Sequence, residues 1–416
     1  MSRPWGCRQA AVGLRAVLFL CLATPSFAQT AAAPPEPQTR AEQLQQQREA
    51  KAIEVKPYEP NALERTMDLA EGKVLPFLMR DGLYGKVGSI STSSGFALGA
   101  GYRDRSLIRG LGALDLFGGW SLKHYWTLSS AVDFPVARRE RVLLNGYARR
   151  YSFVEEEFTG IGPDSTRDQR VVYSMKGWVA GGGLKFKPVK PLIFGAGVEY
   201  QDPEVGPGNG ARFPSIETFF DDATAPAFAG APEFTKPWAF VEVDYREPLN
   251  ARRGGYYRVD VSRVEDRRGG ATSFTRADVD LRQFFSFLAE RRIIAVRALA
   301  STTETDDGAR VPFYLMPTLG GNDTLRGFRA LRFHGAHRML LQAEYRFEVW
   351  SGFDAALFYD TGKVADQRSG LNFKNLEKDY GMGFRFATDK GVVLRVDGAF
   401  GSRDGRHLHI VFGGVF

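Results

Sequence analysis

LGGNDTLRGF (Leu319–Phe328), QAEYRF (Gln342–Phe347) and FYDTG (Phe358–Gly362) follow one another in a single stretch of the chain. The first segment is a glycine-rich loop with one guanidinium group. The other two alternate apolar with polar residues, which is typical of strands that have one apolar and one wet face. These strands carry two carboxylates, so we expect Arg326 to fold back onto Glu344 and Asp360 inside a barrel.

The same period of two continues from residue 80 to the end of the chain. Segments of about 8–12 residues are separated alternately by tight turns and by longer polar loops. We count about sixteen segments, which begin near Leu83, Gly95, Gly112, Lys123, Arg141, Arg170, Leu192, Thr235, Tyr256, Ser273, Arg292, His337, Asp354, Lys378, Val392 and His407. A soluble sandwich also alternates, but repeated charged faces favour an all-β, 16-stranded antiparallel transmembrane β-barrel with a wet interior.

Aromatic residues near strand ends support a membrane barrel. We expect two girdles at headgroup level, formed by Trp120, Tyr125 and Trp126 at one edge and by Phe284, Phe285, Phe287 and Trp350 at the other. The chain also ends on Phe416, on the same face as Leu408, Ile410 and Phe412. A terminal phenylalanine on such a strand resembles the assembly signal of outer-membrane barrels.

Loop lengths predict the orientation, because barrels of this kind keep their periplasmic turns short. The long loops are 154–168, 203–234, 303–336 and 366–377, and we expect them to face out of the cell. The loop that carries Arg326 therefore leaves the barrel on the outer side. It can reach Glu344 and Asp360 only by turning back into the lumen.

The N-terminal residues predict secretion. Residues 1–28 combine three arginines, an apolar run and Ser26-Phe27-Ala28, which indicates a signal peptide. Residues 29–82 are predicted to form a periplasmic linker with a short helix, and residues 83–416 the barrel. Removing the signal peptide removes both cysteines and lowers the formal net charge from +7 to +4, which argues against disulfides, thiol-bound metals and nucleic acid.

The central stretch resembles the BamA/TamA family of outer-membrane assembly-factor barrels. Residues 158–162 (FTGIG), 380–385 (YGMGFR) and 393–397 (VLRVD) extend the resemblance, which covers roughly residues 83–416. It implies that the sixth outer loop enters the lumen and is anchored there by Arg326, Gly327, Phe328, Glu344, Phe358, Asp360 and Gly362. Well-known members also carry periplasmic polypeptide-binding repeats, and we expect these to be lacking here because residues 29–82 are linker-like.

An ion pair alone cannot hold such a loop in the lumen. Ordering about thirty residues costs about 1–2 kcal/mol per residue. Breaking even a buried pair costs only about 3–5 kcal/mol. We therefore expect Arg326 to set the position of the loop while Gly320, Gly321 and many backbone contacts share in holding it.

Three functions are compatible with the sequence. The first is an assembly or translocation barrel that assists insertion or passage of protein or lipid through the seam between the first and last strands, in the outer membrane of a Gram-negative bacterium. The second is a passive channel plugged by its loop. The third, a membrane-barrel hydrolase, lacks a Gly-x-Ser-x-Gly motif and any recognisable triad spacing. We expect no catalytic residues, metal or cofactor; the expected partners are outer-membrane lipid and periplasmic or outer-membrane proteins.

Overall fold

The computed structural model describes residues 81–107, 112–136, 141–210, 212–230, 232–246, 251–388 and 391–412, together with Arg40, Leu44 and Gln45. The expected signal peptide, nearly all of the expected linker and the terminal Phe416 lie outside these residues. The chain divides into two units, Met1–Glu64 and Arg65–Phe416. In the first unit the three described residues are helical. No helix in the described part of the chain is long and apolar enough to cross a membrane.

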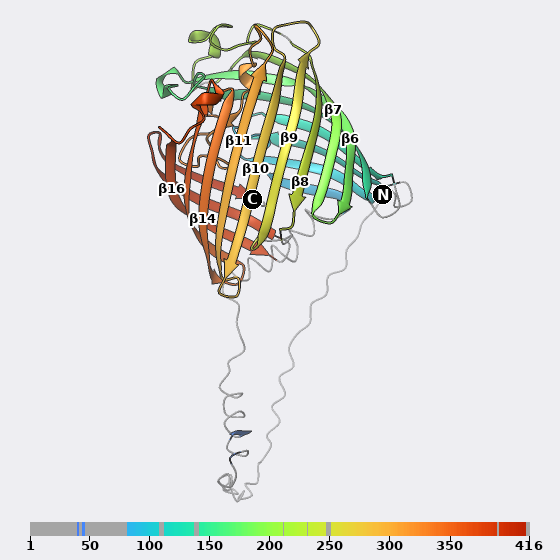
Figure 1. The fold of residues 1–416 in the computed structure, drawn as a ribbon, viewed down its shortest axis with the longest axis vertical. Coiled ribbons are helices and arrows are strands. Elements are labelled where there is room, and N and C mark those ends of the chain that lie inside the picture. The colour runs from blue at the N-terminus through green and yellow to red at the C-terminus, as the bar shows by residue number, and fades with distance from the viewer. Residues whose placement is uncertain are drawn as a thin grey trace, which may run out of the picture. The chain divides into compact units, whose positions relative to one another are not determined.

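In the second unit, one antiparallel sheet of sixteen strands curls into a barrel (Figure 1), which confirms the predicted fold class. Its strands are β1 (Gly82–Gly88), β2 (Ala97–Ser106), β3 (Gly112–Ser121), β4 (Trp126–Pro135), β5 (Val142–Phe158), β6 (Val171–Val189), β7 (Leu192–Pro207), β8 (Phe234–Asp244), β9 (Gly254–Asp266), β10 (Phe274–Phe287), β11 (Arg292–Thr305), β14 (His337–Trp350), β15 (Phe353–Ala365), β16 (Glu377–Thr388), β17 (Gly391–Ser402) and β18 (Gly405–Phe412). Two short strands, β12 (Thr318–Leu319) and β13 (Phe333–His334), pair with each other in the loop between β11 and β14.

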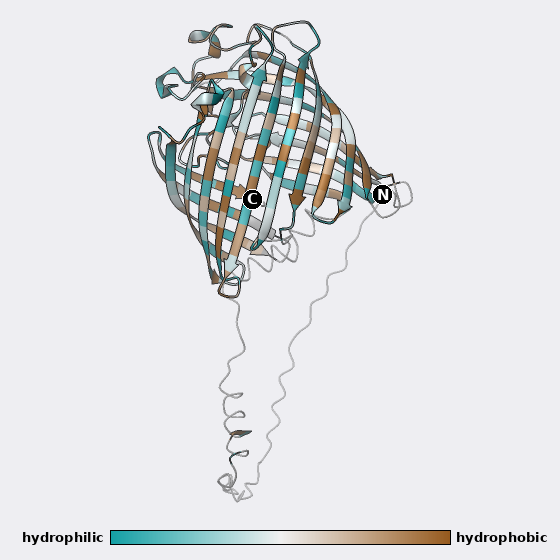
Figure 2. Ribbon diagram, in the orientation of Figure 1, coloured by the Kyte–Doolittle hydropathy of each residue, from teal (hydrophilic) through white to brown (hydrophobic). Residues whose placement is uncertain are grey.

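The apolar residues of the strands face outward. On β14, Leu341 and Tyr345 are exposed, whereas Gln342, Glu344 and Arg346 between them are buried. Figure 2 shows the same alternation of apolar and polar residues along the strands in view. An apolar outer face around a polar interior is the pattern of a barrel surrounded by lipid.

Two details of the predicted strands are wrong. Strands β5, β6 and β7 contain 17, 19 and 16 residues, which is longer than expected. A tilted strand needs only about 9–11 residues to cross a membrane, so their outer ends rise above it. In addition, Tyr125 and Phe284 are buried inside rather than placed in the aromatic girdles.

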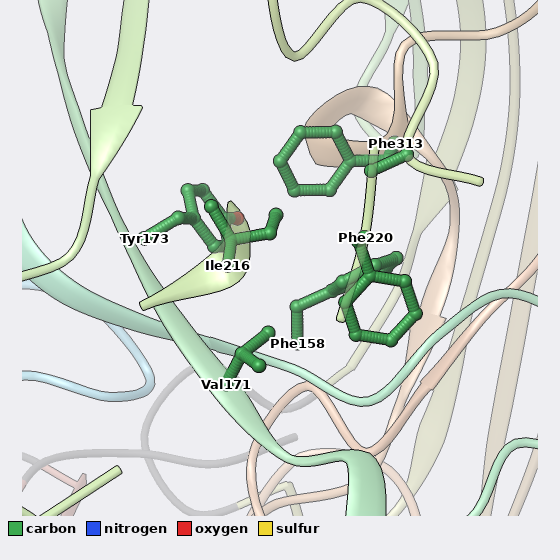
Figure 3. Close-up of a cluster of buried hydrophobic side chains, with 7 residues drawn as sticks. Phe158, Val171, Tyr173, Ile216, Phe220 and Phe313 are labelled. Atoms are coloured by element: carbon green, nitrogen blue, oxygen red, sulfur yellow. The ribbon is translucent and has the colours of Figure 1, made fainter. Parts of the chain in front are cut away.

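The raised ends of β5 and β6 pack against the outer loops. A cluster of fully or nearly buried residues joins these strands to the short 3-10 helices η3 (Ile216–Thr218) and η4 (Phe313–Leu315) (Figure 3). Its buried members are Phe158, Val171, Tyr173, Ile216, Phe220, Ala225 and Phe313. The strand extensions therefore serve as a base for loops on the outer side of the barrel.

Within the described residues, the two ends of the sheet are not joined by a strand ladder. Its strand order runs from β1 to β18, and within the described residues no ladder pairs these two strands. β1 and β18 are also the shortest strands of the barrel, with 7 and 8 residues. The weakest line in the barrel wall is therefore the seam between its first and last strands.

Candidate functional site

Residues 306–336, between β11 and β14, double back as a hairpin. Its two sides are held by the pairing of β12 with β13. At its tip, the Gly321 N–H donates to the Phe328 carbonyl over 3.0 Å. The Gly320 N–H donates to Thr324 Oγ1 over 2.8 Å. The tip is therefore a compact turn with its own hydrogen bonds, and it presents the side chains between Thr324 and Phe328 to the barrel wall.

Three glycines of the loop and of the strand beneath it lie where a side chain would be excluded. Gly320 has φ +114°, and a Cβ there would overlap the Arg329 carbonyl, so a side chain is excluded on both counts. A Cβ on Gly327 would overlap the side chain of Asp379 on β16. A Cβ on Gly362 would lie 2.5 Å from the carbonyl oxygen of residue 339. Gly327 thus lies where the sequence predicts close approach of the loop to the wall, while Gly320 shapes the loop itself and Gly362 lies close to the backbone of β14.

Apolar burial supplies much of the attachment. The tip residues Leu325 and Phe328 are fully buried. They belong to a cluster that also contains Leu319 of β12 and Phe333 of β13 in the loop, and Leu299, Leu340 and Val364 from the inner faces of β11, β14 and β15. Fully burying a leucine or phenylalanine side chain contributes about 1.5–3 kcal/mol. Several such side chains together exceed the contribution of any single ion pair.

Arg326 lies beside this cluster and points at the two predicted carboxylates. Its Nε and Nη2 donate to the two oxygens of Asp360 over 2.7 and 2.8 Å. Its Nη1 donates to Glu344 Oε2 over 2.8 Å. The guanidinium also lies 3.5 Å from the centre of the Phe358 ring. All three charged side chains are essentially inaccessible to water, with exposures of 1% or less.

Glu344 binds two further arginines that the sequence analysis did not place in the site. Its Oε1 accepts from Arg346 Nε over 2.6 Å. Its Oε2 accepts from Arg385 Nη2 over 2.7 Å. Arg385 Nη1 donates in turn to Asp397 Oδ1 over 2.5 Å. Glu344 is therefore the carboxylate that connects the loop to β14 and β16.

Arg395 completes the network on β17. Its Nε lies 3.2 Å from Asp397 Oδ2, and its Nη2 donates to the carbonyl of Asn322 in the loop over 2.6 Å. The alternation of apolar and polar residues could have placed these residues inside the barrel, because Arg385, Arg395 and Asp397 all lie on inward positions of their strands. Their mutual pairing depends on the curvature of the wall, which the alternation does not specify.

The buried network has a structural rather than a chemical character. It contains three carboxylates and four guanidinium groups that bond to one another or to the loop: Glu344, Asp360, Asp397, Arg326, Arg346, Arg385 and Arg395. Buried charges are tolerated when each has partners, and removing one partner leaves the others unpaired. Such a cluster fixes one position of the loop and penalises the alternatives.

The last two strands also hold the tip of the loop. His409 Nε2 donates to the carbonyl of Arg326 over 2.7 Å, and Ser402 Oγ donates to the carbonyl of Gly327 over 2.5 Å. These bonds connect the loop directly to β17 and β18. No group of His, Cys, Asp and Glu suited to a metal ion occurs in the described part of the chain.

The base of the loop binds the outer end of the barrel. Arg332 donates to Thr159 Oγ1, to Ser165 and to Asp404, with distances of 3.2, 2.9 and 2.8 Å. The Gly162 N–H donates to the His334 carbonyl over 2.8 Å. Burial lowers the pKa of His334 to about 3, so this side chain is neutral. The segment 158–162 singled out in the sequence thus contacts the inserted loop.

The matched family model covers the region that contains this network. Residues 244–404 match the Omp85 superfamily domain. This part of the chain is similar to the Omp85 superfamily domain. The matched residues include the inserted loop and every charged residue of the network.

The fold of the barrel is similar to those of two solved proteins. BamA from Haemophilus ducreyi, in a structure lacking POTRA domains 1–3, has a TM-score of 0.59 at 11% identity, over 88% of this chain and 82% of that one. CdiB from Escherichia coli has a TM-score of 0.54 at 13% identity, over 80% of this chain and 62% of that one, so this chain spans less than two thirds of that protein. No curated protein matches the sequence. The resemblance to BamA-type barrels is confirmed, and the fold is that of an outer-membrane barrel.

Proposed function

We propose that this Omp85 barrel assists the insertion or passage of protein at the outer membrane by opening the seam between β1 and β18, without catalysing a reaction. The observation that carries the proposal is the lack of a hydrogen-bonded ladder between these strands in the described residues. Such an edge is readily joined by another strand.

Two features support opening at this place. β1 contains Gly82, Gly85 and Gly88, and glycine weakens a strand. The last hairpin is bound from inside by the loop, through Ser402 and His409. The seam can therefore widen while β17 and β18 stay attached to the rest of the wall. We also propose that periplasmic or outer-membrane proteins deliver the material that passes.

Locking the seam should abolish function. We would introduce cysteine pairs between outward positions of β1 (Leu83, Gly85, Val87) and of β18 (Leu408, Ile410, Phe412). The readout is the insertion of an unfolded barrel substrate into vesicles that contain the full-length protein. We expect the crosslinked pairs to stop insertion and a reducing agent to restore it. A control crosslink between Leu341→Cys and Thr361→Cys, at paired positions of β14 and β15, should leave insertion intact.

Full activity in a verified β1–β18 crosslink would eliminate opening of the seam. Equal loss of activity in the β14–β15 control would show that crosslinking harms the barrel in general. The second outcome would also contradict the proposal, because it would remove the special role of the seam.

A plugged channel is the second candidate, and the interior of the barrel favours it over an open pore. The loop occupies the side of the lumen formed by β14 to β17, and a cavity of about 880 Å³ remains along the wall opposite. Side chains of both signs line this cavity, among them Glu199, Lys236, Glu242 and Arg258. Most of them are paired with each other, as in Lys236–Glu199 at 3.2 Å and Arg258–Glu242 at 2.8 Å.

Conductance in planar bilayers distinguishes a plugged from an open lumen. We expect negligible conductance from the unmodified protein and a stable ion current after deletion of residues 321–331. Deleting residues 368–374 of the loop between β15 and β16 is the control, and it should leave the conductance negligible. A large constitutive conductance of the unmodified protein would show that the loop does not plug the barrel.

A further inference from the structure

Three basic residues lie on the lipid-facing side of β15, β16 and β18 at their outer ends. Lys363 is close to the end of β15, Lys378 is the second residue of β16, and Arg406 is the second residue of β18. Lys378 and Arg406 are exposed and Lys363 is half-buried. Each shares its strand face with exposed apolar residues, which are Leu357 on β15, Met382 on β16 and Ile410 on β18. We call Lys363, Lys378 and Arg406 the cation row.

Exposed tyrosines of an aromatic belt indicate the depth of the cation row. Tyr359 and Tyr380 are paired across β15 and β16 and are 45% and 57% exposed. Thr361 pairs with Lys378, which places this lysine one step further out than the tyrosine pair. Tyrosine marks the boundary between hydrocarbon and headgroups. Lys363 and Lys378 are therefore at the level of the headgroups of the outer leaflet. Arg406 lies at the boundary itself, because Tyr380 pairs with Phe400 and the neighbouring Ala399 pairs with His407.

The cation row is not neutralised by the protein. Within the described residues, Lys378 and Arg406 have no hydrogen-bond or ion-pair partner, and Lys363 Nζ is bound only to the uncharged Lys374 carbonyl and Asn372 side chain. Two acids that are close to the row in sequence are already paired with other arginines. Glu377 binds Arg403 over 2.8 Å, and Asp404 binds Arg332 over 2.8 Å.

An outward-facing lysine on the long strand β6 differs from the cation row, because it has a carboxylate partner. Lys176 of β6 also faces outward near an aromatic residue, Trp178, but Glu204 on β7 lies 2.9 Å from its Nζ. Lys176 and Glu204 thus form a closed pair on an exposed surface. A positive charge on the outer face of this barrel can therefore be neutralised by a neighbouring carboxylate of the protein. The charges of the cation row have no such partner among the described residues.

We propose that the cation row binds the phosphate groups of a phosphorylated lipid of the outer leaflet, whose acyl chains lie along Leu357, Met382 and Ile410. Lysine and arginine at headgroup level attract anionic lipid, and phosphate offers several strong acceptors. The site is on the wall that ends at the seam. A bound lipid would therefore bridge β15 to β18 from outside, opposite the buried network that bridges them from inside.

The test compares lipid binding by the full-length protein and by the variant with Lys363→Gln, Lys378→Gln and Arg406→Gln. Native mass spectrometry in detergent gives the apparent Kd for bisphosphorylated lipid A, for the same lipid without its phosphates, and for inorganic phosphate. Each cation near an anionic surface strengthens binding about fivefold. We expect the triple variant to bind lipid A on the order of 100-fold more weakly. The dephosphorylated lipid and inorganic phosphate should bind weakly to both proteins.

Lys176→Gln is the matched control, because it removes an outward cation that already has a carboxylate partner. It should bind lipid A as the unmodified protein does. On gels, the triple variant should keep the heat-resistant folded form, which checks that the barrel is intact. Lys378→Arg keeps the charge and should preserve lipid binding. Unchanged affinity in the triple variant would overturn the proposal. So would equal binding of dephosphorylated lipid, or equal loss in Lys176→Gln. Tight binding of inorganic phosphate would assign the row to a soluble anion instead.

Discussion

Arg326→Ala should release the inserted loop and lower the stability of the folded barrel by about 3–5 kcal/mol, which is the cost of breaking a buried ion pair from one side. The change removes three charge-assisted hydrogen bonds to Asp360 and Glu344 and leaves the face of Phe358 uncovered. Both carboxylates are shielded from water, so neither can regain hydration without movement of the loop. The measurement is limited trypsin digestion at Arg329 and Arg332, together with the temperature at which the folded form is lost on gels.

Two variants make this result specific to Arg326. Arg326→Lys keeps the charge but loses the two-point contact with Asp360, so we expect an intermediate effect. Arg329→Ala, in the same loop, should change little, because Arg329 is 32% exposed and its nearest carboxylate lies 3.9 Å away. The Arg329→Ala change itself removes one trypsin site, so cleavage of all variants is compared at Arg332. Unchanged digestion of Arg326→Ala would contradict the role of this residue as the anchor of the loop.

The sequence predicts the wall of the barrel better than its interior. Alternation is a local property, and the predicted inward positions Gln342, Glu344 and Arg346 of β14 are buried in the structure, while Glu348, near the end of the strand, is half-buried. The same alternation explains the two errors in the aromatic girdles. Tyr125 and Trp126 are consecutive, as are Phe284 and Phe285, and consecutive residues of a strand point to opposite faces. Only one member of each pair can face lipid.

Lengths of strands and partners of charges depend on more than alternation. β5 and β6 continue past the membrane because residues such as Phe158 and Tyr173 find apolar partners in the outer loops, which are distant in sequence. The Arg326 contacts were expected from a family resemblance and strand parity. The contacts of Arg385 with Glu344 and Asp397 join three strands, and they depend on barrel curvature and side-chain reach. Neither quantity can be read from a period of two.

Apolar packing and the ion network divide the task of holding the loop. Leu325 and Phe328 stabilise insertion without specifying one exact depth, because apolar contacts are not directional. The guanidinium of Arg326 satisfies Asp360 and Glu344 in one position only, because paired hydrogen bonds of this type have a defined geometry. Removing the network should therefore cause the loop to lose its position before it loses its burial. Loss of the network should therefore differ from a simple loss of packing, because the loop stays buried but no longer keeps one position.

Glu344→Gln should be at least as damaging as Arg326→Ala, although it removes no atoms from the packing. Glu344 is the one carboxylate that accepts from Arg326, Arg346 and Arg385 together. An amide keeps the shape but supplies one acceptor oxygen without charge, and its NH₂ group is directed at guanidinium groups that can only donate. We expect a loss of about 3–5 kcal/mol, measured as earlier loss of the heat-resistant form, with protease cleavage at Arg332.

Glu348→Gln is the matched control on the same strand. Glu348 follows Glu344 by four residues and therefore lies on the same face of β14, but it is half-buried near the periplasmic end and outside the network. We expect its stability to stay within about 0.5 kcal/mol of the unmodified protein, as for surface substitutions without special contacts. If Glu344→Gln were as stable as Glu348→Gln, the charge of Glu344 would not hold the loop. Insertion would then depend on the apolar cluster around Leu325 and Phe328 alone.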